Sequence, residues 1–259
     1  MSNLPTYDDV ALERHGLVAV LEIRRPPLNF FDEVLIGHLT AMLQALDNDA
    51  GCRAVVLGAA GSTFCAGADF GSSGGTMDME KIRSLYQQAA VLFETRKPIV
   101  AAIQGAAVGG GLGVALVADF RVTCDKARFS ANFAKLGLHC GFGISVTLPR
   151  LVGANAAAMM LYTGRRLSGS EALAIGLADQ LVEADQVRAA AIALATELAA
   201  SSPLALQDMR ATLRTGLGAQ VRSALEREHA CQSVHSQTAD FREGVLAMSE
   251  RRSPVFTGS

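Results

Sequence analysis

Short apolar runs alternate along the first half of the chain with segments of helical spacing. Residues 17–23 form a nearly continuous apolar run, which predicts a buried strand, and the Pro26-Pro27 pair predicts a turn after it. Over residues 32–47 apolar side chains recur every three or four positions, which predicts an amphipathic helix with Asp32 as its N-cap. The same pattern predicts strands over 54–57, 98–103, 117–123 and at Phe129-Ser130, and helices over 79–94 and 114–118. This alternation favours an α/β architecture.

The pattern changes after about Leu151, where alanine-rich helical spacing dominates and strands are not expected. Helices are predicted over 155–162, 170–175, 185–200, 203–215 and 219–235. Ser168 and Glu171 have the spacing of a capping box at the start of one of these helices. A run of helices indicates an appended helical region, so we expect an α/β core over residues 1–195 and a C-terminal helical region over 196–259.

Two turns rich in glycine and alanine follow predicted strands. One is Phe-Cys-Ala-Gly-Ala-Asp-Phe at residues 64–70, and the other is Gly-Gly-Gly-Leu-Gly at residues 109–113. Such turns can direct two free backbone N–H groups at one point, which is the requirement for an oxyanion hole. The second turn does not fit a dinucleotide-binding fingerprint, because Val114 stands where glycine or alanine is needed. A third glycine-rich stretch, at residues 71–75, predicts a mobile loop.

Composition narrows the classes of function. Half of the residues are apolar, 19% are charged and the net charge is −2, which is typical of a globular protein with a large core. No dense basic stretch is present, so nucleic acid is not an expected partner. The five cysteines are scattered without a Cys-x-x-Cys pair, and the histidines do not cluster with other ligands. We therefore expect no metal site and reduced thiols, as in a cytoplasmic protein.

Two segments bear on targeting and membranes. Residues 1–13 lack the basic and apolar regions of a secretory signal. Residues 99–118 are apolar over a length that could span a bilayer. Their glycines argue against a membrane helix, because each costs about 1 kcal/mol relative to alanine in a helix interior. We expect no membrane association.

The motifs together resemble the crotonase (enoyl-CoA hydratase/isomerase) superfamily over nearly the whole chain. The resemblance rests on the order and spacing of segments 25–29, 53–57, 64–70, 97–105, 109–113, Asp119, 148–153, 163–166, 171–172, 176–179, 241–244 and 254–256. It implies a spiral core of ββα units, with C-terminal helices that complete the core and mediate trimer formation. It further implies a homotrimer, or a hexamer built from two trimers.

The resemblance also implies a site. The backbone N–H groups of Ala68 and Gly110 would form the oxyanion hole for the thioester oxygen of an acyl-CoA. Ala66 matches the position whose backbone contacts the adenine of CoA, and Arg24 or Arg25 would face the CoA phosphates unless both are surface charges. The expected CoA-binding residues are Arg25, Ala66, Ala68, Asp69 and Phe70. Asp69 is expected to cap the following helix or, as an alternative, to act in catalysis. CoA would belong to the substrate, and no permanently bound cofactor is expected.

The expected general acid and base have no counterpart in the sequence. Related hydratases and isomerases carry carboxylates at positions that correspond here to Gly113, Phe133 and Gly141. Among the nearby polar residues, His139 is the candidate acid or base, and a structural histidine is the alternative. Cys140 would act as a nucleophile only with a base beside it, whereas Cys65 is interpreted as a packing residue.

The sequence thus predicts an enzyme of the hydratase/isomerase family, a lyase or isomerase that acts on an acyl-CoA thioester by stabilising an enolate. Two alternatives stay open. The first is a decarboxylase or carbon–carbon hydrolase of the same family; a decarboxylase needs less proton-transfer machinery, because loss of CO₂ itself generates the enolate. The second is an acyl-CoA binding protein without catalysis.

Overall fold

The strands form two sheets in the computed structural model, which describes residues 4–69 and 76–259. The larger sheet has the order β1-β2-β3-β4-β6-β9, in which only β1 and β2 are antiparallel. Its strands are β1 (Val10–His15), β2 (Val18–Ile23), β3 (Ala54–Ala59), β4 (Ile99–Ile103), β6 (Phe120–Thr123) and β9 (Gln180–Leu181). The smaller sheet contains β5 (Ala106–Val108), β7 (Arg128–Ser130) and β8 (Arg166–Leu167).

Successive strands enter different sheets before the chain turns into a helix. β4 and β5 precede α3 (Gly110–Ala115), and β6 and β7 precede the 3₁₀ helix η1 (Asn132–Leu136) and α4 (Ile144–Thr163). Strand, strand and helix therefore repeat, and the parallel pairing of β3, β4 and β6 aligns equivalent positions of the repeats. The predicted α/β spiral of ββα units is confirmed.

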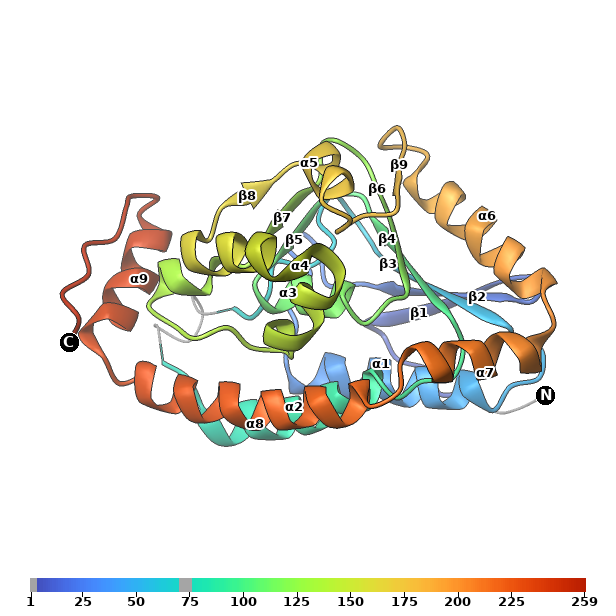
Figure 1. The fold of residues 1–259 in the computed structure, drawn as a ribbon, viewed down its shortest axis with the longest axis horizontal. Helices are drawn as coiled ribbons and strands as arrows, with labels where there is room; N and C mark the ends of the chain where they lie inside the picture. The colour runs from blue at the N-terminus through green and yellow to red at the C-terminus, as the bar shows by residue number, and fades with distance from the viewer. Residues whose placement is uncertain (1–3, 70–75) are drawn as a thin grey trace.

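The remaining helices surround this core. They are α1 (Glu33–Asp47), α2 (Met79–Leu92), α5 (Gly169–Ala174), α6 (Val187–Ala200), α7 (Pro203–Leu213), α8 (Leu217–His235) and α9 (Ala239–Ser249). α6 packs on the larger sheet, α8 lies along α2, and α9 packs on η1 at the C-terminal end of the molecule (Figure 1). The boundary expected after residue 195 falls within α6, and the chain bends between α6 and α7.

Two local capping signals were predicted correctly, but the expectation that Asp69 caps the following helix was wrong. The Asp32 side chain accepts a hydrogen bond from the Leu35 N–H at the start of α1, and Ser168 and Glu171 form the expected capping box. The N-cap of α2 is Asp78, whose carboxylate accepts the Glu80 and Lys81 N–H groups.

Several boundaries also differ from those predicted. α3 begins at Gly110, inside the run predicted as a turn, because these glycines tolerate close packing against neighbouring segments. α4 begins at Ile144, before the helix predicted over residues 155–162, and includes Pro149. β1, β5 and α9 were not predicted, and the short strands β8 and β9 contradict the expectation of helices without strands after Leu151.

The apolar segment 99–118 forms β4, β5 and α3, so it is not one continuous helix, as expected. By length and composition alone, α4 is the one helix of the described part that could cross a membrane. Its backbone leaves helical geometry at Gly153, where φ is 77° and ψ is 163°, so α4 is a broken helix. The loop predicted at 71–75 lies outside the described residues.

Asp119 joins the C-terminal helices to the core. Its carboxylate accepts the Ile99 N–H at 2.8 Å and ion-pairs with Arg210 and Arg214 of the α7 region, each also at 2.8 Å. Arg210 is buried, so its charge depends on this carboxylate for compensation. These contacts give Asp119 a structural role.

The first prediction concerns this ion pair. Asp119→Asn removes the carboxylate shared by two guanidinium groups and should lower the free energy of unfolding by about 3 kcal/mol, because it leaves buried charge uncompensated. Urea denaturation measures the loss, with Asp8→Asn as a control at an exposed aspartate. Equal stability of the two variants would contradict this role for Asp119.

Glu228 of α8 holds the start of α4. Its buried carboxylate accepts the Gly143 N–H at 2.8 Å, the Ser145 N–H at 3.2 Å and the Ser145 hydroxyl at 2.6 Å. The N-cap of α4 is Gly143, which has no side chain to accept these groups, so Glu228 supplies the cap from another helix. Burial raises the pKa of Glu228 above its usual value, although the hydrogen bonds from Ser145 and Gly143 oppose this rise.

The second prediction concerns pH. Because the folded protein binds the Glu228 proton more tightly than the unfolded chain, the contribution of Glu228 to stability is complete below the usual pKa of 4.5 and is lost as pH rises through the folded pKa. Glu228→Gln resembles the protonated form. As pH rises, its free energy of unfolding should therefore increase relative to that of wild type, by about 1.4 kcal/mol per unit of difference between the folded and unfolded pKa of Glu228. Urea denaturation from pH 4.5 to 8 measures this difference. Glu226 is exposed, so the free energy of unfolding of Glu226→Gln should change with pH as that of wild type does.

Candidate active site

Two adjoining cavities lie where the turns after β2, β3 and β5 meet. The outer cavity has a volume of about 660 Å³ and the inner one about 390 Å³. They share the lining residues Phe30, Phe31, Ala68, Asp69, Met77, Ile82 and Leu85. The inner cavity also reaches Ala66 and Gly110. The structure therefore brings together four of the expected site residues: Ala66, Ala68, Asp69 and Gly110.

A buried asparagine fixes the turn that separates β2 from α1. Asn29 is fully buried with a left-handed φ of 49°, and its amide donates to the carbonyl oxygens of Ala60 and Thr63. The Asn29 side chain also accepts the Arg25 N–H. These bonds tie the turn to the segment that leads into residues 64–69, and they place Phe31 against the site.

The two glycine-rich turns meet through backbone contacts. Cys65 pairs with Ala107 in a parallel bridge, and a Cβ added to Gly67 would lie 3.7 Å from the Gly110 nitrogen. Gly110 is the first residue of α3, so its N–H has no partner within the helix. Within the described part of the chain, neither the Ala68 N–H nor the Gly110 N–H donates a hydrogen bond to another residue. Both amides are thus available donors on adjacent turns.

Aromatic side chains occupy the wall where carboxylates were sought. A Cβ added to Gly113 would lie 2.6 Å from the Cβ of Phe142, so any side chain at position 113 would collide with it. Phe142 is buried with φ at 61°, and its ring centroid lies 5.3 Å from that of Phe31. Phe133 lines the same cavity. Asp69 is the only carboxylate among the described residues that line the inner cavity.

Sequence reasoning missed Tyr86 and Gln232, two polar groups of the inner cavity. The Tyr86 hydroxyl donates to the Gln232 side-chain oxygen at 2.9 Å. Burial, with the nearby Glu228 carboxylate, raises the pKa of Tyr86 far above its usual value, so the phenol stays protonated at neutral pH. Tyr86 lies on the buried face of α2 like any core residue, so its position in the sequence gave no signal of its proximity to Gln232 on α8.

The structure does not bring His139 together with the oxyanion-type amides. His139 lines neither cavity. Its ring Nδ1 lies 2.8 Å from the Cys140 carbonyl oxygen, and its backbone N–H donates to Nδ1 of His235. Burial, with Glu228, raises the pKa of the Cys140 thiol to about 12, so Cys140 is a thiol at neutral pH. Cys65 is fully buried and its pKa is likewise raised to about 12 by burial, which agrees with a packing role.

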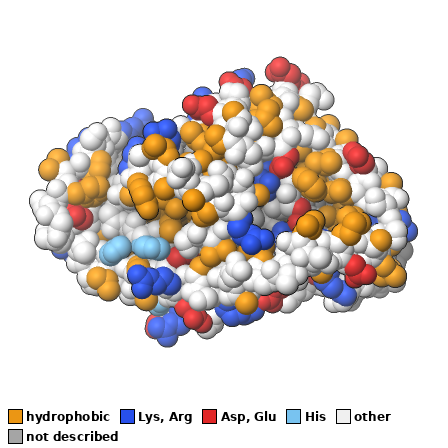
Figure 2. Space-filling model, viewed as in Figure 1, with side chains coloured by type: hydrophobic (Ala, Val, Ile, Leu, Met, Phe, Trp, Pro, Cys, Tyr) orange, Lys and Arg blue, Asp and Glu red, His pale blue; other side chains and the backbone are white. Residues whose placement is uncertain are grey.

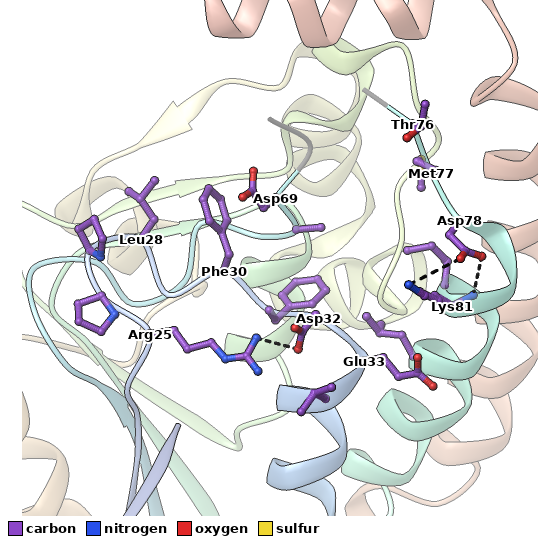
Figure 3. A pocket seen from close by; sticks show the side chains of 17 residues that line it. Arg25, Leu28, Phe30, Asp32, Glu33, Asp69, Thr76, Met77, Asp78 and Lys81 are labelled. Atoms are coloured by element: carbon purple, nitrogen blue, oxygen red, sulfur yellow. Dashed lines mark hydrogen bonds and ion pairs between the residues drawn. The ribbon is translucent and has the colours of Figure 1, made fainter. Parts of the chain in front are cut away.

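The outer cavity carries Arg25 and Lys81 (Figure 3), whereas Arg166 lines the inner cavity. Arg25 points at Asp32, with 2.7 Å between Nη1 and the carboxylate, and its other nitrogens bind Asp9. Lys81 lies at the rim of this cavity, 3.9 Å from Asp78. Arg24, the alternative to Arg25, pairs with Glu22 and lines neither cavity.

Two further expectations concern the remaining site residues. Phe70, the last expected CoA-binding residue, lies outside the described residues. Across residues 4–69 and 76–259, no group of three or more histidine, cysteine or acidic side chains is arranged to hold a metal ion. Within the described residues, the cavities therefore contain backbone N–H donors, aromatic walls and a few polar side chains.

Comparison with known proteins assigns the chain to a family. The sequence profile described as enoyl-CoA hydratase/isomerase matches residues 13–259. A short-chain-enoyl-CoA hydratase from Clostridium acetobutylicum is 30% identical over 95% of this chain and 96% of its own length. An (E)-benzylidenesuccinyl-CoA hydratase from Thauera aromatica is 32% identical over 96% of this chain and 99% of its own length.

A solved structure supports the same assignment. The enoyl-CoA hydratase/isomerase from Pseudoalteromonas atlantica T6c superposes with a TM-score of 0.85 at 29% identity, over 96% of this chain and 100% of that chain. The order of the elements, the paired glycine-rich turns and these matches agree along nearly the full length. The chain belongs to the enoyl-CoA hydratase/isomerase family of the crotonase superfamily.

Proposed function

We propose that the protein binds an acyl-CoA thioester and stabilises its enolate through the N–H groups of Ala68 and Gly110. The observation that carries this proposal is a pair of backbone N–H groups on adjacent turns at an apolar cavity, neither of which donates to another described residue. Preorganised donors in a water-poor site favour charge that develops on an oxygen during the reaction. The two relatives named above act, by their names, on CoA thioesters.

In this proposal the outer cavity binds the CoA part of the substrate. Arg25 and Lys81 carry positive charge at its wall and rim, where they can attract the CoA phosphates. Because Asp9 and Asp32 already bind Arg25, we assign it a long-range attraction in place of a direct bidentate contact. Ala66, Ala68, Asp69 and Phe70 remain the predicted CoA-binding segment. CoA belongs to the substrate in this proposal, with no permanently bound cofactor.

The third prediction tests the two donors. Replacing Ala68 by lactic acid, or Gly110 by glycolic acid, exchanges one N–H for an ester oxygen and keeps the side chain unchanged. Each exchange should lower kcat by about 10²–10³, because one donor to the oxyanion is lost. Isotope-edited infrared spectra of a ¹³C-labelled thioester should show a smaller carbonyl shift on binding. Unchanged spectra in both ester variants would refute the assignment.

Decarboxylation is a second candidate within this chemistry. It is favoured by the inner wall, where Phe133 stands at the position of a family carboxylate, Phe142 fills the space beside Gly113, and the phenol of Tyr86 is not a base. Loss of CO₂ breaks the bond between the carboxylate carbon and the α-carbon and leaves its electron pair as the enolate, so no base is required. An apolar wall also removes water from the departing carboxylate.

The fourth prediction separates these reactions. With methylmalonyl-CoA and crotonyl-CoA as probes, we expect CO₂ release to exceed hydration, which is measured as loss of enoyl-thioester absorbance. Hydration that exceeds decarboxylation and collapses in His139→Ala would instead identify His139 as a relocated acid or base. Binding of both thioesters without turnover of any related thioester would support the alternative of a binding protein.

The surface supports the predicted homotrimer or hexamer. Hydrophobic side chains gather over α6 and α7 on the face drawn in Figure 2. On α7, Leu204 and Leu213 are 75% and 79% exposed, which is unusual for large apolar residues unless another surface covers them. A second copy of the chain is the partner that we propose. The cytoplasmic location and the absence of membrane and nucleic-acid partners stay predictions.

A further inference from the structure

Tyr86 separates the inner cavity from a third cavity. This third cavity has a volume of about 600 Å³ and lies between α2 and α8. Its lining residues are Arg83, Tyr86, Gln87, Ala90, Arg222, Leu225, Glu226 and His229. Among the described residues, Tyr86 is the only one that lines both this cavity and the inner one. Its ring therefore forms the partition between them.

The partition is held in place from several sides. Tyr86 is 8% exposed, and its hydroxyl donates to Gln232, which is itself buried. The Gln232 amide in turn donates to the His139 carbonyl oxygen at 3.0 Å, so the hydrogen-bond acceptor of the phenol is fixed. A Cβ added to Gly141 would lie 1.9 Å from the Tyr86 hydroxyl oxygen, which shows how closely the loop encloses the ring. The ring cannot swing aside without breaking these contacts.

We propose that Tyr86 closes the far end of the acyl pocket and restricts the substrate to short acyl groups. This proposal rests on the proposed function, because the thioester oxygen must lie at Ala68 and Gly110 for the acyl chain to point inward. A long alkyl chain meets the Tyr86 ring before it reaches the third cavity. Removing the ring joins cavities of about 390 and 600 Å³.

The opened route offers both apolar and charged surface to an acyl tail. Ala90 and Leu225 lie on its wall, next to Arg83, Arg222 and Glu226. A tail that enters it buries methylene groups against Ala90 and Leu225, and each fully buried methylene raises affinity about fourfold. Two or three such groups correspond to a gain of roughly 10- to 60-fold.

The experiment measures the dissociation constants of butyryl-, hexanoyl-, octanoyl- and decanoyl-CoA by calorimetry. Wild type should bind butyryl-CoA at least about tenfold more tightly than decanoyl-CoA, because the Tyr86 ring blocks the longer tail, which can bind only by displacing the contacts that fix the ring. Tyr86→Phe keeps the ring and should keep this preference. Tyr86→Ala should gain roughly 10- to 60-fold in decanoyl-CoA affinity while butyryl-CoA changes less than about threefold. Tyr162→Ala, at a tyrosine that is 80% exposed, is the matched control.

The outcomes distinguish the role of Tyr86 from the proposed acyl-CoA function on which it rests. Binding of all chain lengths with equal affinity by wild type overturns the partition and leaves the proposed function standing. No binding of any acyl-CoA overturns both. Because Tyr86→Ala leaves a cavity, Tyr86→Leu provides a second opening variant with less lost volume. If neither variant folds, the wild-type chain-length series alone decides. An unchanged preference in a folded opening variant overturns the proposal.

Discussion

The backbone contact between the segments 65–68 and 106–111 is the constraint on which the rest of the site depends. The Cys65 N–H donates to the Ala106 carbonyl oxygen, and the Val108 N–H donates to the Cys65 carbonyl oxygen. These bonds bring together two turns that lie some forty residues apart in the chain. The close approach requires glycine, because a Cβ on Gly111 would lie 2.1 Å from the Cys65 carbonyl oxygen. The Ala68 and Gly110 amides, which donate to none of the described residues, lie side by side because these bonds hold the two turns together.

Two carboxylates attach the outer helices α7 and α8 to the core. Asp119 ties α7 to the start of β4, and Glu228 ties α8 to the start of α4. Each of these carboxylates satisfies backbone N–H groups that would otherwise stay unpaired, so each acts as a structural cap supplied from a distance. The Glu228 contact with Gly143 also fixes the segment that carries Gly141 and Phe142 of the inner cavity.

Local and long-range features differ in how far the sequence predicted them. The Asp32 cap and the Ser168–Glu171 box depend on side chains within one turn of a helix, and both were predicted correctly. The paired glycine turns were predicted from family resemblance, and their contact agrees with it. Tyr86 and Gln232 belong to helices that only the tertiary fold brings together. The position of His139 beside His235, away from the cavity, depends on the same long-range packing.

Boundaries were missed where packing overrides local preference. α3 begins with glycines that would weaken an isolated helix, because close approach to neighbouring segments compensates for their low propensity. α4 contains Pro149 and a non-helical Gly153, both typical helix breakers. Strand β1 lies at the edge of the larger sheet, where only Val10 of its residues is buried, so its hydrophobic pattern is weak.

The packing of Phe142 against Gly113 also constrains how this protein can change. A carboxylate cannot be introduced at position 113 while residue 142 carries a Cβ, as Phe142 does, since the two Cβ atoms would lie 2.6 Å apart. Replacing Phe142 first would remove a buried ring that packs against Phe31 beside the oxyanion-type turns. The two positions are thus coupled, and each single step toward an acid at this wall is destabilising by itself. A lineage or an engineer that restores this acid must change both residues together.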